Sequence, residues 1–302
     1  MERDAAVREA AAILPRELRL ALLARPAWEQ SGWEEIRLRA GRGLSCADST
    51  GRETRITGPG GEALPVSGED LRLTVERATR ASLQGASEKL AEGFLPLPGG
   101  HRLGLCGTAA LREGQVLAFR SLSSLNIRIA CPVPGVGEAL LPRLMADGAF
   151  QSTLILAPPG EGKTTLLRDL IRLLGLAGIR VGLADERGEV AALRQGVPQL
   201  EVGPLADVLD GCPKGEGLLL LLRAMAPQVL AVDEITHPRD VSALCQGANC
   251  GTAILATAHG SSLEELANRP LYRPLLEDKV FRRVITIARA EGRRSYRAEE
   301  LP

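Results

Sequence analysis

The sequence predicts an α/β fold for the C-terminal half of the chain and a smaller α+β domain before it. After residue 138, apolar runs that end in polar residues alternate with stretches of helical spacing, which is typical of parallel strands joined by helices. Before residue 131 the two patterns are mixed, and the Pro- and Gly-rich stretch 132–138 reads as a linker. We therefore expect an α+β domain over 1–131, a linker over 132–138 and the α/β domain over 139–302.

The N-terminal domain is expected to begin with helices. Residues 5–25 place Ala and Leu at helical spacing, with a break at Pro15 and an end before Pro26. A further helix is expected to begin at Gly68-Glu69-Asp70. Strands are expected where apolar and charged residues alternate or where short apolar runs occur. They are residues 35–41, a hairpin over 94–105 with Gly99 and Gly100 at its turn, 116–120 and 126–130.

Polar residues follow the apolar runs of the C-terminal domain at the points where strands should end. The runs are residues 154–156, 179–185, 229–233 and 253–257. Ligands of open α/β sheets bind at the carboxyl ends of the strands. The polar residues that end these runs are therefore expected to converge on the segment that follows Leu156.

That segment is one residue away from a phosphate-binding loop. Residues 157–164 read A-x-x-x-x-G-K-T, with Ala157 where the pattern G-x-x-x-x-G-K-[ST] has glycine. Backbone N–H groups of such a loop hold phosphate oxygens. Lys163 is expected to reach the terminal phosphates of ATP, and the Thr164 hydroxyl to bind Mg²⁺. The expected nucleotide-binding residues are Ala157, Pro158, Pro159, Gly160, Glu161, Gly162, Lys163, Thr164 and Thr165.

Two carboxylates follow the apolar run 229–232, as in a Walker B element. Asp233 is expected to bind Mg²⁺ directly or through water, and Glu234 to polarise the attacking water. The alternative is a pair of solvated acids at a strand end. The phosphate-binding loop earlier in the chain favours the first interpretation.

Two more strand ends supply candidate catalytic residues. Among the acids of 185–189, Glu186 is favoured over Asp185 and Glu189 as a water-positioning or metal-organising carboxylate; a solvated turn is the alternative. His259 ends the run after Walker B, where it could contact the γ-phosphate and report its presence; otherwise it is a turn residue. His101 and His237 are expected to be structural.

Composition restricts the class of protein. Lys+Arg and Asp+Glu both number 37, and aromatic residues make up 3%, so neither a strong positive field nor stacking platforms for nucleic acid are present. There is no run of 18 uncharged apolar residues, and the charged N-terminus does not resemble a signal peptide. The six cysteines lack metal-ligand spacing. We expect reduced, mostly buried thiols in a cytosolic protein, with Mg²⁺ as the only metal.

The whole chain resembles the stage III sporulation protein AA family of endospore-forming bacteria. These proteins are P-loop ATPases similar to the hexameric secretion and pilus-motor ATPases. The resemblance is carried by residues 35–39, 99–104, 158–160, 185–187, 196–199, 207–214, 233–235 and 257–259. The stretch 196–214 is the most specific of them, and its chemistry is not evident from the residue types.

The resemblance implies a RecA-like P-loop ATPase core with nucleotide held between neighbouring subunits of a homo-oligomer, a hexamer. It implies that residues 185–189 correspond to the Asp box of secretion ATPases and His259 to the His box. Arg120 and Arg128 are the candidates for the N-terminal arginines that approach the phosphates there. The tetra-Cys zinc motif of some secretion ATPases is missing. The implied partners are small membrane proteins of a channel between mother cell and forespore, with the ATPase on the cytoplasmic side.

Three functions are compatible with these features. The leading one is an oligomeric motor ATPase that does work on a partner through movement about the linker. A nucleic-acid translocase on the same core is disfavoured by the charge balance and the scarcity of aromatic residues. A nucleotide-gated scaffold, which assembles with ATP but hardly hydrolyses it, is the third; the acid pair at 233 and 234 argues against it.

Overall fold

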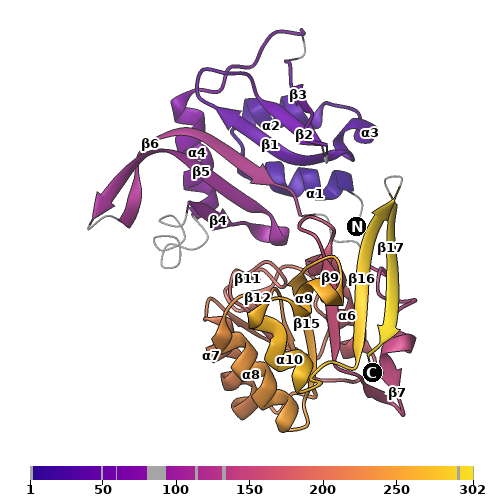
Figure 1. Cartoon of the computed structure of the whole chain (residues 1–302). Coiled ribbons are helices and arrows are strands. Elements are labelled where there is room, and N and C mark those ends of the chain that lie inside the picture. The colour runs from indigo at the N-terminus through magenta and orange to yellow at the C-terminus, as the bar shows by residue number, and fades with distance from the viewer. Residues whose placement is uncertain are drawn as a thin grey trace. The chain divides into compact units, whose positions relative to one another are not determined.

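The chain forms two compact units, Met1–Pro132 and Val133–Pro302, each with its own core (Figure 1). The computed structural model describes residues 3–48, 50–58, 60–79, 93–112, 115–130, 134–290 and 293–301. The N-terminal unit runs from indigo to magenta in Figure 1, and the C-terminal unit continues from magenta to yellow.

Short helices open the N-terminal unit, and prolines separate them. Helix α2 begins directly after Pro15, and α3 directly after Pro26, because proline suits the start of a helix but not its interior. The predicted break and end are therefore confirmed. The helices are α1 (Arg3–Ala10), η1 (Ala11–Ile13), α2 (Arg16–Leu23), α3 (Ala27–Gln30) and, later in the chain, α4 (Gly68–Thr79).

A six-stranded antiparallel sheet completes this unit, in the order β3-β2-β1-β6-β5-β4. Its strands are β1 (Trp33–Arg39), β2 (Ser45–Asp48), β3 (Glu53–Arg55), β4 (Phe94–Pro96), β5 (Arg102–Arg112) and β6 (Gln115–Arg128). The strands predicted over 116–120 and 126–130 are parts of one strand, β6, which ends at Arg128. The residues between them continue the pairing with β5 through β-bulges. The predicted hairpin turn is η2 (Pro98–Gly100), where Gly99 and Gly100 have φ of 67° and 77°.

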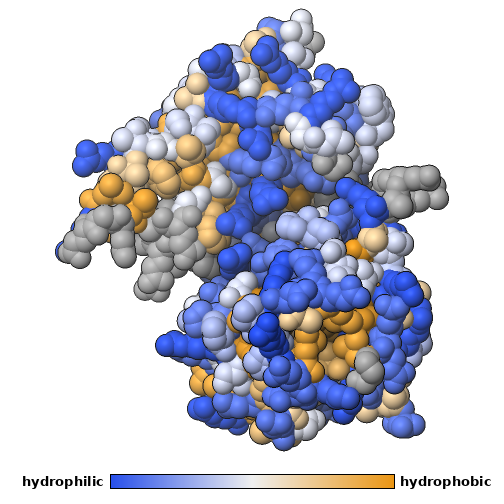
Figure 2. All heavy atoms as spheres, viewed as in Figure 1, coloured by the Kyte–Doolittle hydropathy of each residue, from blue (hydrophilic) through white to orange (hydrophobic). Residues whose placement is uncertain are grey.

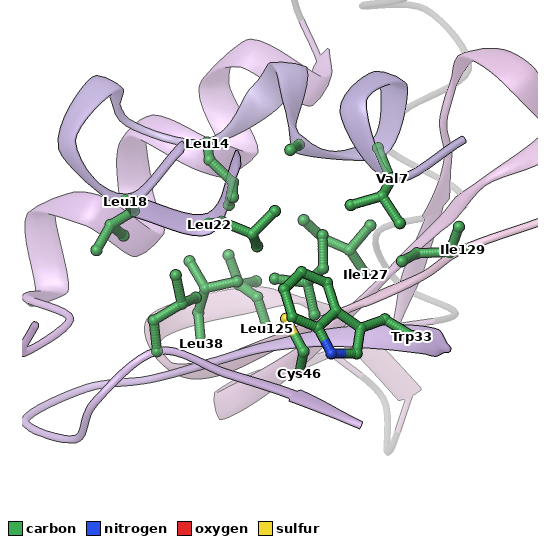
Figure 3. Packing of buried hydrophobic residues seen from close by; sticks show 14 of the residues in the cluster. Val7, Leu14, Leu18, Leu22, Trp33, Leu38, Cys46, Leu125, Ile127 and Ile129 are labelled. Atoms are coloured by element: carbon green, nitrogen blue, oxygen red, sulfur yellow. The ribbon is translucent and has the colours of Figure 1, made fainter. Parts of the chain in front are cut away.

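The core of the N-terminal unit lies between the helices and one face of the sheet. Leu14, Leu18 and Leu22 point from the helical segment toward the strands in Figure 3. The strands supply Trp33 and Ile127 among other residues, all nearly inaccessible to solvent. Helical spacing in one segment and alternation in the other thus place apolar side chains on facing surfaces.

Strands β5 and β6 extend beyond this core as a two-stranded hairpin. Leu111, Val116 and Leu117 are exposed on its distal part, where Figure 2 shows hydrophobic colour. Register shifts at several points of the β5–β6 pairing twist the hairpin. A hairpin of two strands is only marginally stable in water by itself, so its base in the larger sheet anchors it.

The C-terminal unit contains a seven-stranded sheet in the order β13-β10-β14-β15-β9-β16-β17. All neighbouring strands are parallel except β16 and β17, which form a hairpin. The strands are β9 (Thr153–Ala157), β10 (Val181–Asp185), β13 (Ala206–Asp210), β14 (Val229–Val232), β15 (Ala253–His259), β16 (Arg283–Ala290) and β17 (Arg293–Glu300). Short strands outside the sheet are β7 (Met145–Ala146), β8 (Ala149–Phe150), β11 (Leu193–Arg194) and β12 (Val197–Pro198).

Helices cover both faces of this sheet, so its central strands are buried on both sides. Ile155 of β9 belongs to the core under α6, whereas Leu154 and Leu156 belong to the core on the other face. None of the helices that the structure describes is long and apolar enough to cross a membrane. The helical elements are η3 (Leu141–Leu144), α6 (Lys163–Leu176), α7 (Lys214–Ala224), α8 (Pro238–Asn249), α9 (Leu263–Ala267), η4 (Pro270–Tyr272) and α10 (Arg273–Glu277).

The five cysteines that lie in the described residues are free, but the prediction that most cysteines are buried was wrong for them. Of those in the described residues, only Cys46 is buried; Cys106 and Cys250 are exposed, and Cys212 and Cys245 are intermediate. Cys46 lies on β2 within the N-terminal core, whereas Cys250 is the exposed residue that follows α8. Cys131 lies outside the described residues.

His101 is a buried residue of the N-terminal unit, as its structural interpretation predicts. The backbone N–H of Ala130 donates to its Nδ1 over 2.9 Å, and its Nε2 lies 3.8 Å from Oε2 of Glu9. Burial lowers the pKa of His101 from its usual 6.5 to about 4. The folded state therefore favours the neutral imidazole.

We expect the stability of the N-terminal unit to fall as the pH drops from 6.5 toward 4. In that window the unfolded chain takes up a proton on His101 and the folded chain does not, which costs about 3 kcal/mol in total. The His101→Asn variant, which keeps an acceptor for Ala130, should lose this part of the pH dependence. Urea unfolding followed by the fluorescence of Trp28 and Trp33, both in this unit, measures it. Identical pH dependence in the two proteins would contradict the assignment.

Candidate active site

The predicted phosphate-binding loop connects the end of β9 to the start of α6. Gly160 and Gly162 have φ of 78° and 92°, values that glycine adopts at little cost. Gly162 is the N-cap of α6, and Lys163 is its first residue. Residues 157–165 thus form a strand end, a glycine turn and the first turn of a 14-residue helix.

Lys163 lies almost completely buried inside the loop. Its Nζ donates to the carbonyl oxygens of Ala157 and Pro158, over 2.8 and 2.9 Å. Burial lowers the pKa of Lys163, and the neighbouring carboxylates, among them Asp233 and Glu234, oppose that shift. The ammonium group is therefore held at the site by the loop's own carbonyls and by acids from another strand.

Asp233 joins the P-loop helix to two neighbouring strands. It follows β14, and its Oδ2 accepts a hydrogen bond of 2.6 Å from the hydroxyl of Thr164 on α6. Its Oδ1 accepts one of 2.7 Å from the hydroxyl of Thr257 on β15. The predicted pair Thr164 and Asp233 is therefore in direct contact.

Glu234 has an unusual backbone conformation that brings it close to the loop. Its φ is 56°, in the left-handed region that residues other than glycine seldom adopt. Its N–H donates to the hydroxyl of Thr257 over 2.8 Å. The carboxylate Oε1 lies 2.7 Å from Nε2 of His259, and Oε2 lies 3.8 Å from Nη1 of Arg187.

His259 connects Lys163 with Glu234. Its Nδ1 lies 2.8 Å from Nζ of Lys163, and its Nε2 contacts the Glu234 carboxylate. Because the Lys163 ammonium can only donate, Nδ1 accepts, and Nε2 carries the proton that Glu234 accepts. Three residues predicted from separate segments thus form one hydrogen-bonded chain.

Asp185 has a structural role in the loop after β10. Its buried carboxylate accepts hydrogen bonds from the backbone N–H groups of Glu189, Val190 and Ala191 at 2.8 to 3.2 Å. Arg168 of α6 donates to the carbonyl oxygens of Glu189 and Val190. Burial lowers the pKa of Arg168, and Asp185 and Asp233 oppose the shift. The Asp185 carboxylate therefore stabilises the turn formed by residues 186–191.

Glu186, the acid favoured by the sequence, lies beside Lys214 instead. Its Oε2 accepts from the backbone N–H of Lys214 over 3.4 Å and is 3.8 Å from Lys214 Nζ. Its side chain is 43% exposed. The structure thus gathers Lys163, Thr164, Asp233, Glu234 and His259, and places Glu186 next to a lysine that the sequence reasoning did not single out. The catalytic role of Glu186 stays a prediction.

Arg120 and Arg128 both lie on β6 of the N-terminal unit. Arg120 is exposed and is the extra residue of a β-bulge, opposite Thr108 and Ala109. The Arg128 side chain is 68% exposed, with Nε 3.8 Å from Oε1 of Glu35. Their approach to a nucleotide stays a prediction.

Two arginines of the C-terminal hairpin also contact the loop, and sequence reasoning missed them. Arg289 and Arg294 face each other across β16 and β17, and each Nε lies 3.9 Å from Oε2 of Glu161. Arg294 also donates to the carbonyl of Gly160 over 3.3 Å. No local pattern predicts this contact, because it depends on where the hairpin joins the sheet.

Lys214 and Thr257 were missed as well, although the sequence contains a signal for the first. Lysine occurs at only four positions, Lys89, Lys163, Lys214 and Lys279, in a chain with 37 basic residues. The scarcity of lysine makes each of these four positions worth inspecting, because lysine carries a compact point charge that arginine does not. Thr257 belongs to the predicted strand end before His259, but a threonine in a strand gives no signal by itself.

We expect Asp185→Asn to destabilise the C-terminal unit by about 1.5–3 kcal/mol, because the amide replaces a charged acceptor and turns donors toward backbone N–H groups. Asp207→Asn on the adjacent strand β13 is the matched control, and its change should stay within about 0.5 kcal/mol. Urea unfolding followed by far-ultraviolet circular dichroism measures both. Equal midpoints for the two variants would contradict the structural role of Asp185.

Comparisons with known proteins agree with this geometry. Residues 5–297 match the family described as "Sporulation stage III, protein AA". The stage III sporulation protein AA of Bacillus subtilis is 37% identical over 289 residues, which cover 94% of this chain and 92% of that protein. The match therefore spans both units.

Two solved structures share the fold. The ATPase DotB of Legionella pneumophila aligns with a TM-score of 0.57 at 18% identity, over 88% of this chain and 76% of DotB. The pilus retraction motor PilT, solved with bound ADP, aligns with a TM-score of 0.58 at 13% identity, over 89% of this chain and 79% of PilT. The predicted α/β fold with a P-loop ATPase core and a smaller N-terminal α+β domain is thereby confirmed. The chain belongs to the sporulation stage III protein AA family and shares its fold with the ATPase DotB and the pilus retraction motor PilT.

Proposed function

We propose that this protein binds Mg-ATP at residues 157–165 and hydrolyses it as an oligomeric motor that energises a sporulation transport channel between mother cell and forespore. The observation that carries the proposal is the 2.6 Å contact of Thr164 with Asp233, beside the chain of Lys163, His259 and Glu234. These are the residue types that phosphoryl transfer requires, at the carboxyl ends of parallel strands.

The loop fits a polyphosphate. Gly160 and Gly162 hold the backbone in a turn that leads into the N-terminus of α6, where N–H groups and the helix dipole favour an anion. Lys163 already lies inside this turn and has carbonyl partners that a phosphate can replace. Ala157 is buried as the last residue of β9, and the glycine usually found at its position is not needed there.

The oxygen donors fit Mg²⁺. The Thr164 hydroxyl and the Asp233 carboxylate are hard ligands in contact with each other. The residues that the structure describes contain no group of three or more His, Cys, Asp or Glu side chains suited to a metal. A cation here would complete its shell with phosphate oxygens and water, as Mg²⁺ commonly does, and would neutralise charge on the phosphates.

In this proposal Glu234 orients and deprotonates the water that attacks the γ-phosphate. Its carboxylate is held by His259 Nε2 at 2.7 Å, and His259 in turn contacts Lys163. A γ-phosphate that draws Lys163 away would alter this chain, which gives His259 the role of reporting nucleotide state. Glu186 would act on the same site from the end of β10.

The assembly is proposed from family membership and from the resemblance to secretion ATPases. We propose a homo-oligomer, a hexamer, in which Arg120 and Arg128 approach the nucleotide, docked at the cytoplasmic side on small membrane proteins of the channel. DotB is an ATPase and PilT a motor with bound ADP, and their shared fold supports nucleotide-driven movement. Nucleic acid is not an expected partner, since acidic and basic residues balance at 37 each.

Two substitutions test hydrolysis. Glu234→Gln should keep nucleotide affinity but lower phosphate release by roughly 100-fold or more, because it removes the base. Lys163→Ala should lose both nucleotide affinity and phosphate release, because the charge that holds the phosphates is gone. Binding of a fluorescent ATP analogue and release of phosphate measure the two effects on the full chain.

Two outcomes would contradict the proposal. Hydrolysis unchanged by both substitutions would place turnover elsewhere. In the second outcome, wild type and Glu234→Gln assemble alike when ATP is added, and neither releases phosphate. That result would instead favour a nucleotide-gated scaffold.

A further inference from the structure

We propose that Lys214 is a positioning residue for Glu234, holding its backbone so that the carboxylate is aimed at the reaction centre. The proposal rests on the proposed ATPase function and deepens it. It also gives a role to the segment 207–214, whose chemistry the sequence left unexplained.

Lys214 is the first residue of α7, and its side chain runs inward from there. Its Nζ donates to the carbonyl oxygen of Glu234 over 2.6 Å and to the hydroxyl of Thr236 over 3.1 Å. Glu186 Oε2, at 3.8 Å, is its ion-pair partner. Only 7% of the residue is exposed. The ammonium thus has two hydrogen-bond acceptors and a carboxylate nearby, and a buried charge needs such partners.

Lys214 donates to the carbonyl of Glu234, which is the residue of the site other than glycine that has a left-handed backbone conformation. Glu234 has φ of 56°, and such conformations persist only where surrounding contacts determine them. Thr257 accepts from the N–H of Glu234, and Lys214 donates to its C=O. Tyr272 donates to the next carbonyl, that of Ile235, over 2.7 Å. Lys214 supplies the charged member of this set.

The contact explains how Glu234 reaches His259. A left-handed turn directly after β14 changes the direction in which the Glu234 side chain leaves the backbone. If its carbonyl lost Lys214, residue 234 could relax toward an ordinary conformation, and the carboxylate would move away from His259 Nε2, now 2.7 Å distant. Displacement by about 1 Å is enough to slow a positioned reaction strongly.

Lys214 is not expected to bind nucleotide. Its contacts are with residues 234, 236 and 186, whereas the contacts of the phosphate-binding loop are made by Lys163 and Thr164. Its loss should therefore lower the rate of hydrolysis without lowering affinity. Glu186 acts on the site through Lys214. Its carboxylate is the counter-charge that lowers the cost of burying the Lys214 ammonium.

The test is Lys214→Met, which keeps the length of the side chain but removes its donors. We expect kcat to fall roughly 10- to 100-fold, while the Kd of a fluorescent ATP analogue changes less than about two-fold. Lys279→Met, at an exposed lysine of the same unit, is the matched control and should leave both values unchanged. In a Glu234→Gln background, Lys214→Met should reduce the residual rate little further, because the two residues act as a unit.

A second variant keeps the test decisive if Lys214→Met folds poorly. Thr236→Val removes one acceptor of the ammonium at an exposed position, and we expect a several-fold fall in kcat at unchanged Kd. Wild-type kcat in both Lys214→Met and Thr236→Val, or loss of affinity in parallel with rate, would overturn the proposal. So would full additivity with Glu234→Gln.

The failure of this inference differs from failure of the proposed function. If Lys163→Ala and Glu234→Gln lose hydrolysis while Lys214→Met keeps it, the ATPase assignment stands and only the role of Lys214 falls. If Lys163→Ala hydrolyses ATP like wild type, the ATPase site itself is wrongly assigned, whatever Lys214→Met shows.

Discussion

The hydrogen bond between Thr164 and Asp233 is the interaction on which the arrangement of the site depends. It ties the first turn of α6 to the end of β14, and Thr257 ties the same carboxylate to β15. Three elements that are distant in sequence are thereby locked at one edge of the sheet. The parallel order β14-β15-β9 makes this possible, because it brings the carboxyl ends of the three strands together.

The residues around that bond divide into those that face the proposed phosphates and those that hold them in place. Lys163 and His259 belong to the first kind and form a continuous chain with Glu234. Asp185 and Lys214 belong to the second. The buried carboxylate of Asp185 accepts from three backbone N–H groups, and the buried ammonium of Lys214 donates to a carbonyl and a hydroxyl beside the Glu186 carboxylate. Buried charges are costly unless they are paired in this way. Asp185 at the end of β10 and Lys214 at the start of α7 therefore each fix the backbone of a neighbouring segment.

Much of this could be predicted from sequence, because the signals were local. The loop 157–165 carries its pattern in consecutive residues, and the acids at 233 and 234 follow a buried strand directly. The remainder depended on long-range geometry. Two predicted strands merged into β6 because bulges keep its register with β5, and Arg294 meets the loop only through the hairpin's place in the sheet. Glu186 is an acid of the type expected at the site. Its contact with Lys214, which lies 28 positions later, could not be predicted from residues 185–189 alone.

The central claim is that Asp233 and Thr164 hold the magnesium ion of a bound nucleotide. The most direct test compares the affinity of a non-hydrolysable fluorescent ATP analogue with Mg²⁺ and with chelator, in wild type and in Asp233→Asn. The account predicts that Mg²⁺ tightens binding to wild type, and that Asp233→Asn loses this gain while its affinity in chelator stays at the wild-type value. An equal gain from Mg²⁺ in both proteins would contradict it.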